Sequence, residues 1–465
     1  MDMACRIKSC FSQILLCSAS VDLHNPDKGV ERVEIPIGNL IKLKRIELGM
    51  SQEELARGIC ASSYLSRIEN NKLIPNEDIY VLLLKRLGLD YDEIVNDVDT
   101  VDEEIEAWYR ELIAYKYDWI ANGGGREERD IAELQKRADL AGAETGLKLR
   151  AVYCRYLLEK GEIREAVLQL EKLKQAIPQR ANRTFFIYAN VMIFSFMLQG
   201  DYRKAIDCGL EMSKVKGFNE FGDQEEMGIF FYNIALSYMY LNKYKKAKDY
   251  AEKALGLFNN GYHLERSFNT LIILGACETN LNQFTTAEKT YKLAKKLLNY
   301  LPKGKFKHFI GMIENNLGVC KILQGSFIEA IHYFEKALEI VQEKERIVPL
   351  INLVYSCYVA DKIDEARGWM EEILRVGLEH LPELYRVQIE ILDVLLDEGE
   401  GDIKEIERVQ KLGLDYLLKN DHLQLALRYA ELFIHLYEKK HYYKKANELY
   451  KIIQATQREM IEGGW

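Results

Sequence analysis

The stretch S-Q-E-E-L-A-R-G-I-C-A-S-S-Y-L-S-R-I-E-N, residues 51–70, decides the fold of the N-terminal part of the chain. Ser51 and Glu54 make an S-x-x-E capping box, which predicts that a short helix begins here. A second helix is expected to start at Ser62. Two short helices joined by a tight turn are typical of a helix-turn-helix that reads DNA.

The second of these helices has an apolar side and a polar side. Leu65 and Ile68 are expected to face inward, which leaves short polar and basic side chains outside. Such side chains suit base edges and phosphates in a DNA major groove. The candidate DNA contacts on this helix are Ser62, Ser63, Tyr64, Ser66 and Arg67.

The flanking sequence predicts further helices around this pair. An apolar helical stripe that stops at Gly49 precedes it, formed by Ile37, Leu40, Ile41 and Leu48. Pro75, followed by N-E-D, is expected to open another helix that runs to Gly88. Residues 36–94 are therefore expected to form one small helical domain, followed at residues 95–146 by an acidic linker and a helical adaptor.

This domain resembles the helix-turn-helix of the phage-repressor and Xre type. The hallmarks S/T-Q-x-E-L-A, then S-x-x-S-x-I-E, then Pro are all present. The resemblance implies that Gln52 hydrogen-bonds the DNA backbone and that Ser62, Ser63 and Ser66 lie where bases are read. A small helical bundle with no role in DNA binding is the alternative interpretation.

Charge supports DNA binding only locally. The chain has 63 basic and 72 acidic residues, a net charge of −9, which excludes a generally basic nucleic-acid binder. Residues 37–75 hold six basic residues and four acidic ones, a net +2, and Lys72 is a further candidate DNA contact. A patch this small binds DNA weakly. We therefore expect at least a homodimer on a paired double-stranded operator.

Composition predicts an all-α cytoplasmic protein. The 465 residues include only seven prolines, no segment is apolar enough to cross a membrane, and the nine cysteines are scattered without a C-x-x-C pair. No spacing predicts a metal ligand set, a cofactor or a catalytic group, so we expect no enzyme. Residues 1–35 are expected to be a disordered tail or an upstream extension of the reading frame.

A second pattern recurs through residues 147–465. A turn residue is followed two positions later by an apolar residue and three positions after that by a small or aliphatic one, the anchor. The eight instances begin at Gly161, Gly200, Asn242, Asn282, Gly325, Asp361, Gly401 and His441, and their anchors are Ala166, Ala205, Ala247, Ala287, Ala330, Ala366, Ile406 and Ala446. Successive instances lie 39, 42, 40, 43, 36, 40 and 40 residues apart.

The pattern predicts helical hairpins. The turn residue ends the first helix, the apolar residue fills the joint, and the small anchor lets the two helices cross closely. A hairpin of this kind buries its apolar face only by stacking on its neighbours, which predicts a right-handed α-solenoid with a concave groove. These hairpins resemble tetratricopeptide repeats, most clearly at residues 315–338, although they are longer than about 34 residues.

A helix-turn-helix followed by tetratricopeptide repeats resembles the RRNPP family of peptide-sensing regulators, especially its NprR and PlcR branches. The resemblance covers residue 36 to about residue 460. It implies a quorum-sensing transcriptional regulator whose groove binds a short re-imported signalling peptide. In that family the peptide changes how subunits assemble, and so whether DNA is bound.

Asparagine recurs where the first helix of each hairpin is expected to line the groove. Asn233, Asn316 and Asn352 lie 14 residues before their anchors, Asn190 and Asn315 lie 15 before, and Asn269 lies 18 before. A carboxamide can pair with both the N–H and the C=O of an extended peptide. The asparagines therefore predict a backbone clamp, or alternatively a set of hydrogen bonds that ties adjacent hairpins together.

Other groove positions suit the ends and side chains of a peptide. Lys148 and Arg155 of the first hairpin could hold a carboxylate, and Tyr232 could pack against an apolar side chain. The plainer interpretation of Lys148 and Arg155 is a solvated helix face.

Two other functions stay open. A Rap-like regulator would bind a two-component response regulator through protein contacts, although no Rap catalytic glutamine can be placed in this chain. A DNA-bound scaffold would hold a helix of a partner protein in the groove. A groove of asparagines favours a free peptide, whereas an apolar stripe would favour a partner helix.

Overall fold

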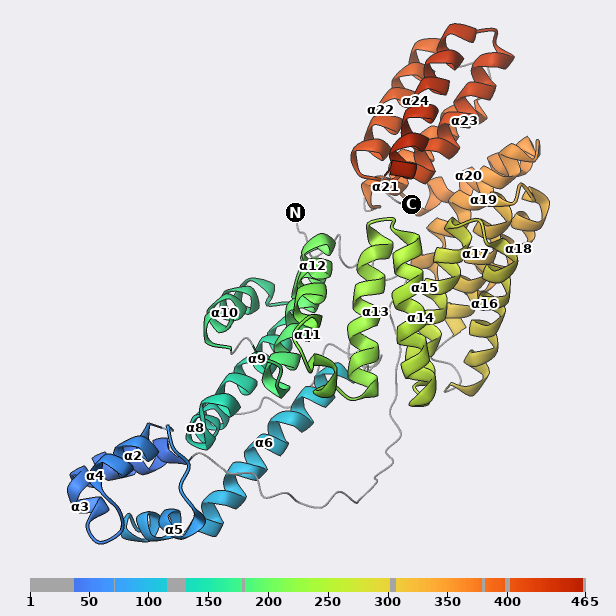
Figure 1. Ribbon diagram of the computed structural model, residues 1–465. Helices are drawn as coiled ribbons and strands as arrows, with labels where there is room; N and C mark the ends of the chain where they lie inside the picture. Colours follow the sequence, from blue (N-terminus) through green and yellow to red (C-terminus); the bar gives the residue numbers. More distant parts are fainter. Residues whose placement is uncertain are drawn as a thin grey trace. The chain divides into compact units, whose positions relative to one another are not determined.

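The computed structural model describes residues 37–70, 72–114, 131–177, 180–301, 307–378, 381–397 and 402–462 (Figure 1). Helices make up the regular secondary structure of these ranges, and no strand is found within them, which confirms the all-α class. No helix in the same ranges has both the length and the apolar character needed to cross a membrane. Residues 1–35, Gly401 and residues 123–125 lie outside the described residues.

The N-terminal domain consists of four short helices: α2 (Gly38–Glu47), α3 (Gln52–Ala56), α4 (Ser62–Glu69) and α5 (Glu77–Arg86). Helix α4 starts at the residue that the sequence predicts, and α5 follows the expected N-cap region at Asn76. The fully buried core includes Ile37, Ile41, Leu55, Leu65, Ile68, Leu83 and Leu84.

One member of the predicted apolar stripe is placed differently. Leu48 was expected on the inward face, but 49% of its surface is exposed. The reason is that α2 ends at Glu47 and Leu48 is its C-cap, directly before the chain reverses at Gly49 with φ 68°. The prediction for Leu48 was therefore wrong, whereas Ile37 and Ile41 are buried as expected.

The acidic linker is helical. It belongs to α6 (Tyr91–Ile113), a single helix of 23 residues, and α8 (Ile131–Ala141) follows it in the adaptor. Both helices pack against α9, the first helix of the repeats. The buried ring of Trp108 on α6 lies 5.5 Å, centroid to centroid, from the ring of Tyr156 on α9. The adaptor thus closes the N-terminal end of the first hairpin.

Eight helical hairpins follow, and we call the first helix of each the A helix and the second the B helix. Chain contacts divide the protein into two compact units that meet in sequence between Asp223 and Gln224. In the unit before this point the hairpin helices are α9 (Ala143–Lys160), α10 (Ile163–Ala176), α11 (Arg183–Leu198) and α12 (Tyr202–Ser213), followed by the short η1 (Phe218–Glu220).

The unit after this point holds six hairpins and two short 3₁₀ segments. Its elements are α13 (Gln224–Tyr240), α14 (Tyr244–Asn260), α15 (Leu264–Asn280), α16 (Phe284–Leu297), η2 (Leu298–Tyr300), α17 (Lys307–Leu323), α18 (Phe327–Ile340), η3 (Glu343–Glu345), α19 (Ile347–Val359), α20 (Ile363–Val376), α21 (Glu383–Leu396), α22 (Ile403–Lys419), α23 (Leu423–Lys439) and α24 (Tyr443–Glu462).

The predicted turns and anchors are confirmed wherever the structure describes them. The turn residues share a left-handed backbone; they are Gly161, Gly200, Asn242, Asn282, Gly325, Asp361 and His441. Only Gly, Asn, Asp and His occupy these turns, the residue types that best tolerate positive φ. All eight anchors are buried, including Ile406 of the weakest repeat. Tyr443 departs from the pattern, because its ring is 58% exposed instead of filling the joint.

A and B helices differ in how they are buried. In α13, 13 of 17 residues are buried, whereas α14 buries only five of 17 along one stripe. Cys154, Cys277 and Cys357 are fully buried on A helices, and burial raises the pKa of each thiol to about 12. The A helices therefore form the interior of each stack, and the B helices cover it.

Close crossing of the A and B helices also depends on glycines of the A helices, which are not part of the predicted pattern. A Cβ at Gly275 would lie 2.5 Å from the ring of Tyr291, and one at Gly318 would lie 2.5 Å from the ring of Phe334. Both glycines precede their anchors by 12 residues, and both rings follow by four. Glycine on the A helix thus makes room for the aromatic ring of the B helix.

Candidate functional site

Helix α4 presents the polar face that the sequence predicts for DNA. Ser63 and Arg67 are exposed, one turn apart, on the side away from the core. Ser62, Tyr64 and Ser66 are half-buried, and Lys72 beyond the helix end is exposed. Contact of these seven candidate residues, Gln52 included, with DNA stays a prediction, with Ser63 and Arg67 the most accessible on α4.

The capping box orients the helix that precedes α4. The N–H of Glu54 donates to Oγ of Ser51 at 3.1 Å, and the N–H of Ser51 donates to Oε2 of Glu54 at 2.7 Å. The hydrogen bonds from the backbone and the hydroxyl of Ser51 lower the pKa of the Glu54 carboxyl. The predicted start of α3 is therefore confirmed with both hydrogen bonds of the box.

A buried carboxylate ties three helices of this domain together. Glu69, at the end of α4, has no exposed side-chain surface and accepts from Nε and Nη2 of Arg45 at 2.6 and 2.9 Å. Nε2 of Gln52 also donates to Oε2 of Glu69, at 2.8 Å. The hydrogen bond with Glu69 raises the pKa of Arg45 against the opposing effect of burial.

This network changes the role expected for Gln52. Its amide is held by Glu69 inside the domain, so its predicted contact with the DNA backbone stays a prediction. Sequence reasoning missed Glu69, although a signal exists: it lies one turn after the inward-facing Leu65, where an acidic residue needs a basic partner. Helix α2 supplies that partner in Arg45.

On the A helices of the repeats, the predicted asparagines are buried or half-buried. Asn190, Asn233, Asn269 and Asn352 are exposed by 4–9%, and Asn315 and Asn316 are half-buried. Nδ2 of Asn190 donates to the carbonyl of Phe186 at 3.2 Å. Within the described residues, Oδ1 of Asn190 and Oδ1 of Asn269 have no hydrogen-bond partner although both atoms are buried.

Another pair of asparagines joins adjacent hairpins by a hydrogen bond, which is the alternative to a backbone clamp. Nδ2 of Asn352 on α19 donates to Oδ1 of Asn315 on α17 at 3.2 Å. This hydrogen bond joins the A helices of adjacent hairpins. Asn315 and Asn352 therefore tie hairpins together, whereas Asn190 and Asn269 keep free acceptors.

Tyr232 on α13 carries a further buried polar atom, its hydroxyl, that has no hydrogen-bond partner in the described ranges. Burial raises the pKa of this hydroxyl against the opposing charge of Arg266 on α15. Arg266 is itself held by Glu225, with Nε 2.6 Å from Oε1. Because Arg266 and Asn269 lie three residues apart on α15, Tyr232 and Asn269 border the same contact between two A helices. Apolar packing of Tyr232 against a ligand stays a prediction.

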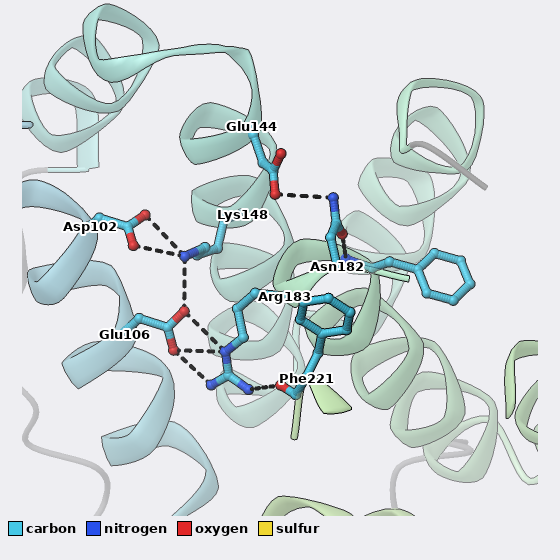
Figure 2. Close-up of polar contacts among 8 residues, drawn as sticks. Asp102, Glu106, Glu144, Lys148, Asn182, Arg183 and Phe221 are labelled. Atoms are coloured by element: carbon cyan, nitrogen blue, oxygen red, sulfur yellow. Dashed lines mark hydrogen bonds and ion pairs between the residues drawn. The ribbon is translucent and has the colours of Figure 1, made fainter. Parts of the chain in front are cut away.

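Figure 2 shows a cluster of charges that joins α6 to α9 and α11. Nζ of Lys148 on α9 donates to both carboxylate oxygens of Asp102 at 3.0 and 2.9 Å, and lies 2.9 Å from Oε1 of Glu106. Arg183 at the start of α11 donates to Glu106 through Nε at 3.1 Å and Nη2 at 2.7 Å, and to the carbonyl of Phe221 at 2.8 Å. Burial raises the pKa of Glu106, but the hydrogen bonds and charges of Arg183 and Lys148 outweigh it, so the pKa is lowered.

The cluster alters the interpretation of the two cations predicted to hold a peptide carboxylate. Lys148 is buried and already paired, which corrects the idea of a solvated helix face. Arg155 stacks its guanidinium 3.6 Å from the centre of the Phe194 ring and donates to Glu159 at 2.5 Å. Binding of a ligand carboxylate by Lys148 or Arg155 stays a prediction.

No group of three or more His, Cys, Asp or Glu side chains with the geometry of a metal site occurs in the described ranges. The polar groups described above on the A helices are amides, a hydroxyl and paired charges. These groups can donate and accept hydrogen bonds to a bound polypeptide.

Comparison with family models supports both halves of the architecture. A helix-turn-helix family model matches residues 41–94. A tetratricopeptide-repeat model matches residues 230–260 and 315–341, which cover most of the hairpins α13/α14 and α17/α18.

Two characterised proteins are similar in sequence. The transcriptional activator NprA of Geobacillus stearothermophilus is 26% identical over 419 residues, which cover 88% of this chain and 100% of NprA. The type II methyltransferase M.CeqI of Rhodococcus hoagii is 25% identical over 291 residues, which cover 60% of this chain and 55% of that protein.

Solved structures share the fold. The apo quorum sensor NprR from B. thuringiensis superposes with a TM-score of 0.57 at 16% identity, covering 77% of this chain and 99% of that chain. NprR in complex with its cognate peptide NprX gives 0.53 at 18% identity, with the same coverage. A Rap protein complexed with Competence and Sporulation Factor gives 0.57 at 16% identity, covering 78% and 99%. The helix-turn-helix, the tetratricopeptide repeats and the similarity to NprA over most of the length support the resemblance of this chain to the RRNPP family of regulators.

Proposed function

We propose that this protein is a cytoplasmic transcriptional regulator that binds operator DNA through α4 and a short extended peptide through its A helices. The observation that carries the proposal is the pair of buried carboxamide oxygens, on Asn190 and Asn269, that lack hydrogen-bond partners among the residues that the structure describes. An unpaired buried acceptor costs about 1–3 kcal/mol, so it is usually kept where something else binds.

The peptide half of the proposal rests on the chemistry of these acceptors. An extended peptide has one N–H and one C=O per residue, and a carboxamide can satisfy either of them whatever the peptide side chain. Asn233 and Asn269 lie on the successive A helices α13 and α15, so they would meet successive parts of one peptide. NprR, which has the same fold, has been solved with its cognate peptide NprX.

The DNA half rests on the exposed face of α4 and the similarity to NprA. Arg67 can bind guanine or phosphate, and Ser63 can bind either a base edge or the backbone. Because the patch around α4 is small and the chain is acidic overall, we propose that two copies bind a paired operator. Peptide binding would change the assembly of these copies and thereby the occupancy of the operator.

We propose a regulatory rather than an enzymatic role. NprA, similar over most of the chain, is a transcriptional activator, whereas the methyltransferase similarity covers just over half of that enzyme. A response regulator remains the alternative partner of the repeats, since Rap proteins share the fold.

The direct test uses the purified full-length protein and the short peptides encoded immediately downstream of its gene. Calorimetric titration measures binding, and light scattering after size exclusion measures assembly with and without peptide. We expect one downstream peptide to bind and to change both the mass of the particle and its affinity for the gene's own promoter. A scrambled peptide of the same composition is the control.

Two results would contradict the proposal. Equal binding of the authentic and scrambled peptides would remove the ligand assignment. Binding without any change in mass or promoter affinity would remove the regulatory link.

A further inference from the structure

The charge cluster of Figure 2 holds two cations that converge on one carboxylate. Lys148 of α9 and Arg183 of α11 both contact Glu106 of α6, at 2.9 and 2.7 Å. A basic pair on neighbouring helices with donors directed at the same point is suited to bind a carboxylate. In this structure the carboxylates are supplied by the chain itself, from the helix that follows the DNA-binding domain.

The two cations lie on the same helix faces as the proposed ligand contacts. Lys148 precedes Arg155 by seven residues on α9, and Arg183 precedes Asn190 by seven residues on α11. Seven residues are about two helical turns, so each pair shares one face of its helix. The cation pair therefore lies two turns away, along the helices, from the unpaired acceptor of Asn190.

The carboxylates of α6 are not held equally. Glu106 is 17% exposed and bound by both cations, with two nitrogens of Arg183 on its oxygens. Asp102 is 39% exposed, and among the residues that the structure describes Lys148 is its one cationic partner. A second carboxylate can therefore replace Asp102 on Lys148 while Glu106 stays in place and Asp102 turns to solvent.

We propose that Lys148 and Arg183 form the carboxylate-binding end of the ligand face, and that the free C-terminal carboxylate of the bound peptide displaces Asp102 from Lys148. This inference rests on the proposed peptide-binding function and adds the orientation of the peptide. Asp102 acts as an internal competitor. Because it belongs to α6, its displacement changes the contacts of the helix that leads to the DNA-binding domain.

The test compares one downstream-encoded peptide, made with a free C-terminus and as its amide, on three full-length proteins. These are the natural chain, Asp102→Asn and the matched control Glu103→Gln, which removes one exposed carboxylate from the neighbouring position of α6. We expect the free acid to bind the natural chain about tenfold more tightly than the amide, because an amide cannot form the ion pair.

The variants separate competition from general charge. Asp102→Asn should raise the affinity for the free acid by about three- to tenfold and leave the amide nearly unchanged, since the competing ion pair is removed. Glu103→Gln should match the natural chain for both peptides. A fourth protein, Lys148→Gln, should lose most of the preference for the free acid, because the remaining cation, Arg183, is held by Glu106.

The outcomes also separate this inference from the proposed function. No binding of either peptide form would overturn both. Binding of acid and amide with equal affinity to the natural chain would overturn this inference alone, and that comparison holds even if Lys148→Gln fails to fold. Equal gains in acid affinity for Asp102→Asn and Glu103→Gln would also overturn it, because general charge would then explain the effect.

Discussion

The two surfaces proposed for recognition of DNA and of peptide differ in how exposed their polar groups are. On α4, Ser63 and Arg67 stand exposed over a closed apolar core. On α11 and α15, Asn190 and Asn269 are exposed by 5% and 4%, inside the stack of A helices. The surface on α4 proposed for DNA is exposed to solvent. The hydrogen-bonding groups proposed for peptide, on α11 and α15, are buried.

The difference predicts how each surface responds to substitution. Exposed side chains on α4 contribute little to folding, so their loss should affect binding alone. Buried polar side chains on the A helices contribute to folding when they are paired, as Asn315 is with Asn352. When they are unpaired, as Asn269 is at Oδ1, the cost is already present in the free protein.

The largest effect is expected where the DNA-binding domain itself has a buried charge. Glu69→Ala should destabilise this domain by about 3–5 kcal/mol, because Arg45 then loses its partner in a half-buried place. Hydrogen exchange of residues 37–94 would report the loss, and operator binding should disappear with it. The exposed Glu53→Ala is the control, and equal protection in both variants would mean that Glu69 does not hold these helices together.

A smaller effect, confined to DNA binding, is expected from the exposed face. Ser63→Ala combined with Arg67→Ala should weaken specific operator binding by about 2–4 kcal/mol, because two polar contacts in the groove are lost. The melting temperature and the peptide affinity should not change. A gel shift with unchanged affinity for the native promoter would disprove the role of α4.

The A helices allow a matched pair of substitutions. Asn269→Ala should weaken peptide binding by about 1–3 kcal/mol and leave the melting temperature nearly unchanged, since no internal partner loses a bond. Asn315→Ala should do the reverse, because Asn352 would lose the acceptor that joins the two hairpins. Calorimetry and melting curves on both variants measure this crossover, and equal behaviour of the two would remove the distinction between clamp and tie.

The smallest effect is expected at the N-terminus. Deleting residues 1–34 should change operator affinity and stability by less than about 0.5 kcal/mol, because no predicted helix-turn-helix or repeat element depends on them. Gel shift and light scattering check this. A monomer where the full chain forms a dimer would show that these residues contribute to assembly.

The sequence predicted the fold well because local rules determine it. Capping residues define the start of α3, and residues that tolerate positive φ mark the hairpin turns, so helix ends were predictable. Leu48 was misplaced because the end of α2, one residue earlier, removes it from the helical period. The helical period predicts the orientation of a side chain only for residues that lie within the helix.

The polar partners were less predictable, because they lie far apart in sequence. Glu69 pairs with Arg45 across 24 positions, and Arg183 pairs with Glu106 across 77. Offsets from the anchors predict that Lys148 faces the groove, which stays a prediction, and they carry no information about α6, which supplies its carboxylates. Helix period predicts which face a side chain occupies, and only the packing of other helices determines its partner.

Because α6 is one continuous helix, the number of its residues determines both its length and the rotation between its two ends. Each residue of an α-helix adds about 1.5 Å of length and about 100° of rotation. The 23 residues from Tyr91 to Ile113 therefore span about 34 Å as one helix. Inserting a single residue between Tyr91 and Asp102 would turn everything before it by about 100°, whereas inserting seven would restore the angle to within about 20°. The number of residues in this segment therefore sets an angle as well as a length, and regulators of this type should tolerate insertions here in steps of a heptad rather than one by one.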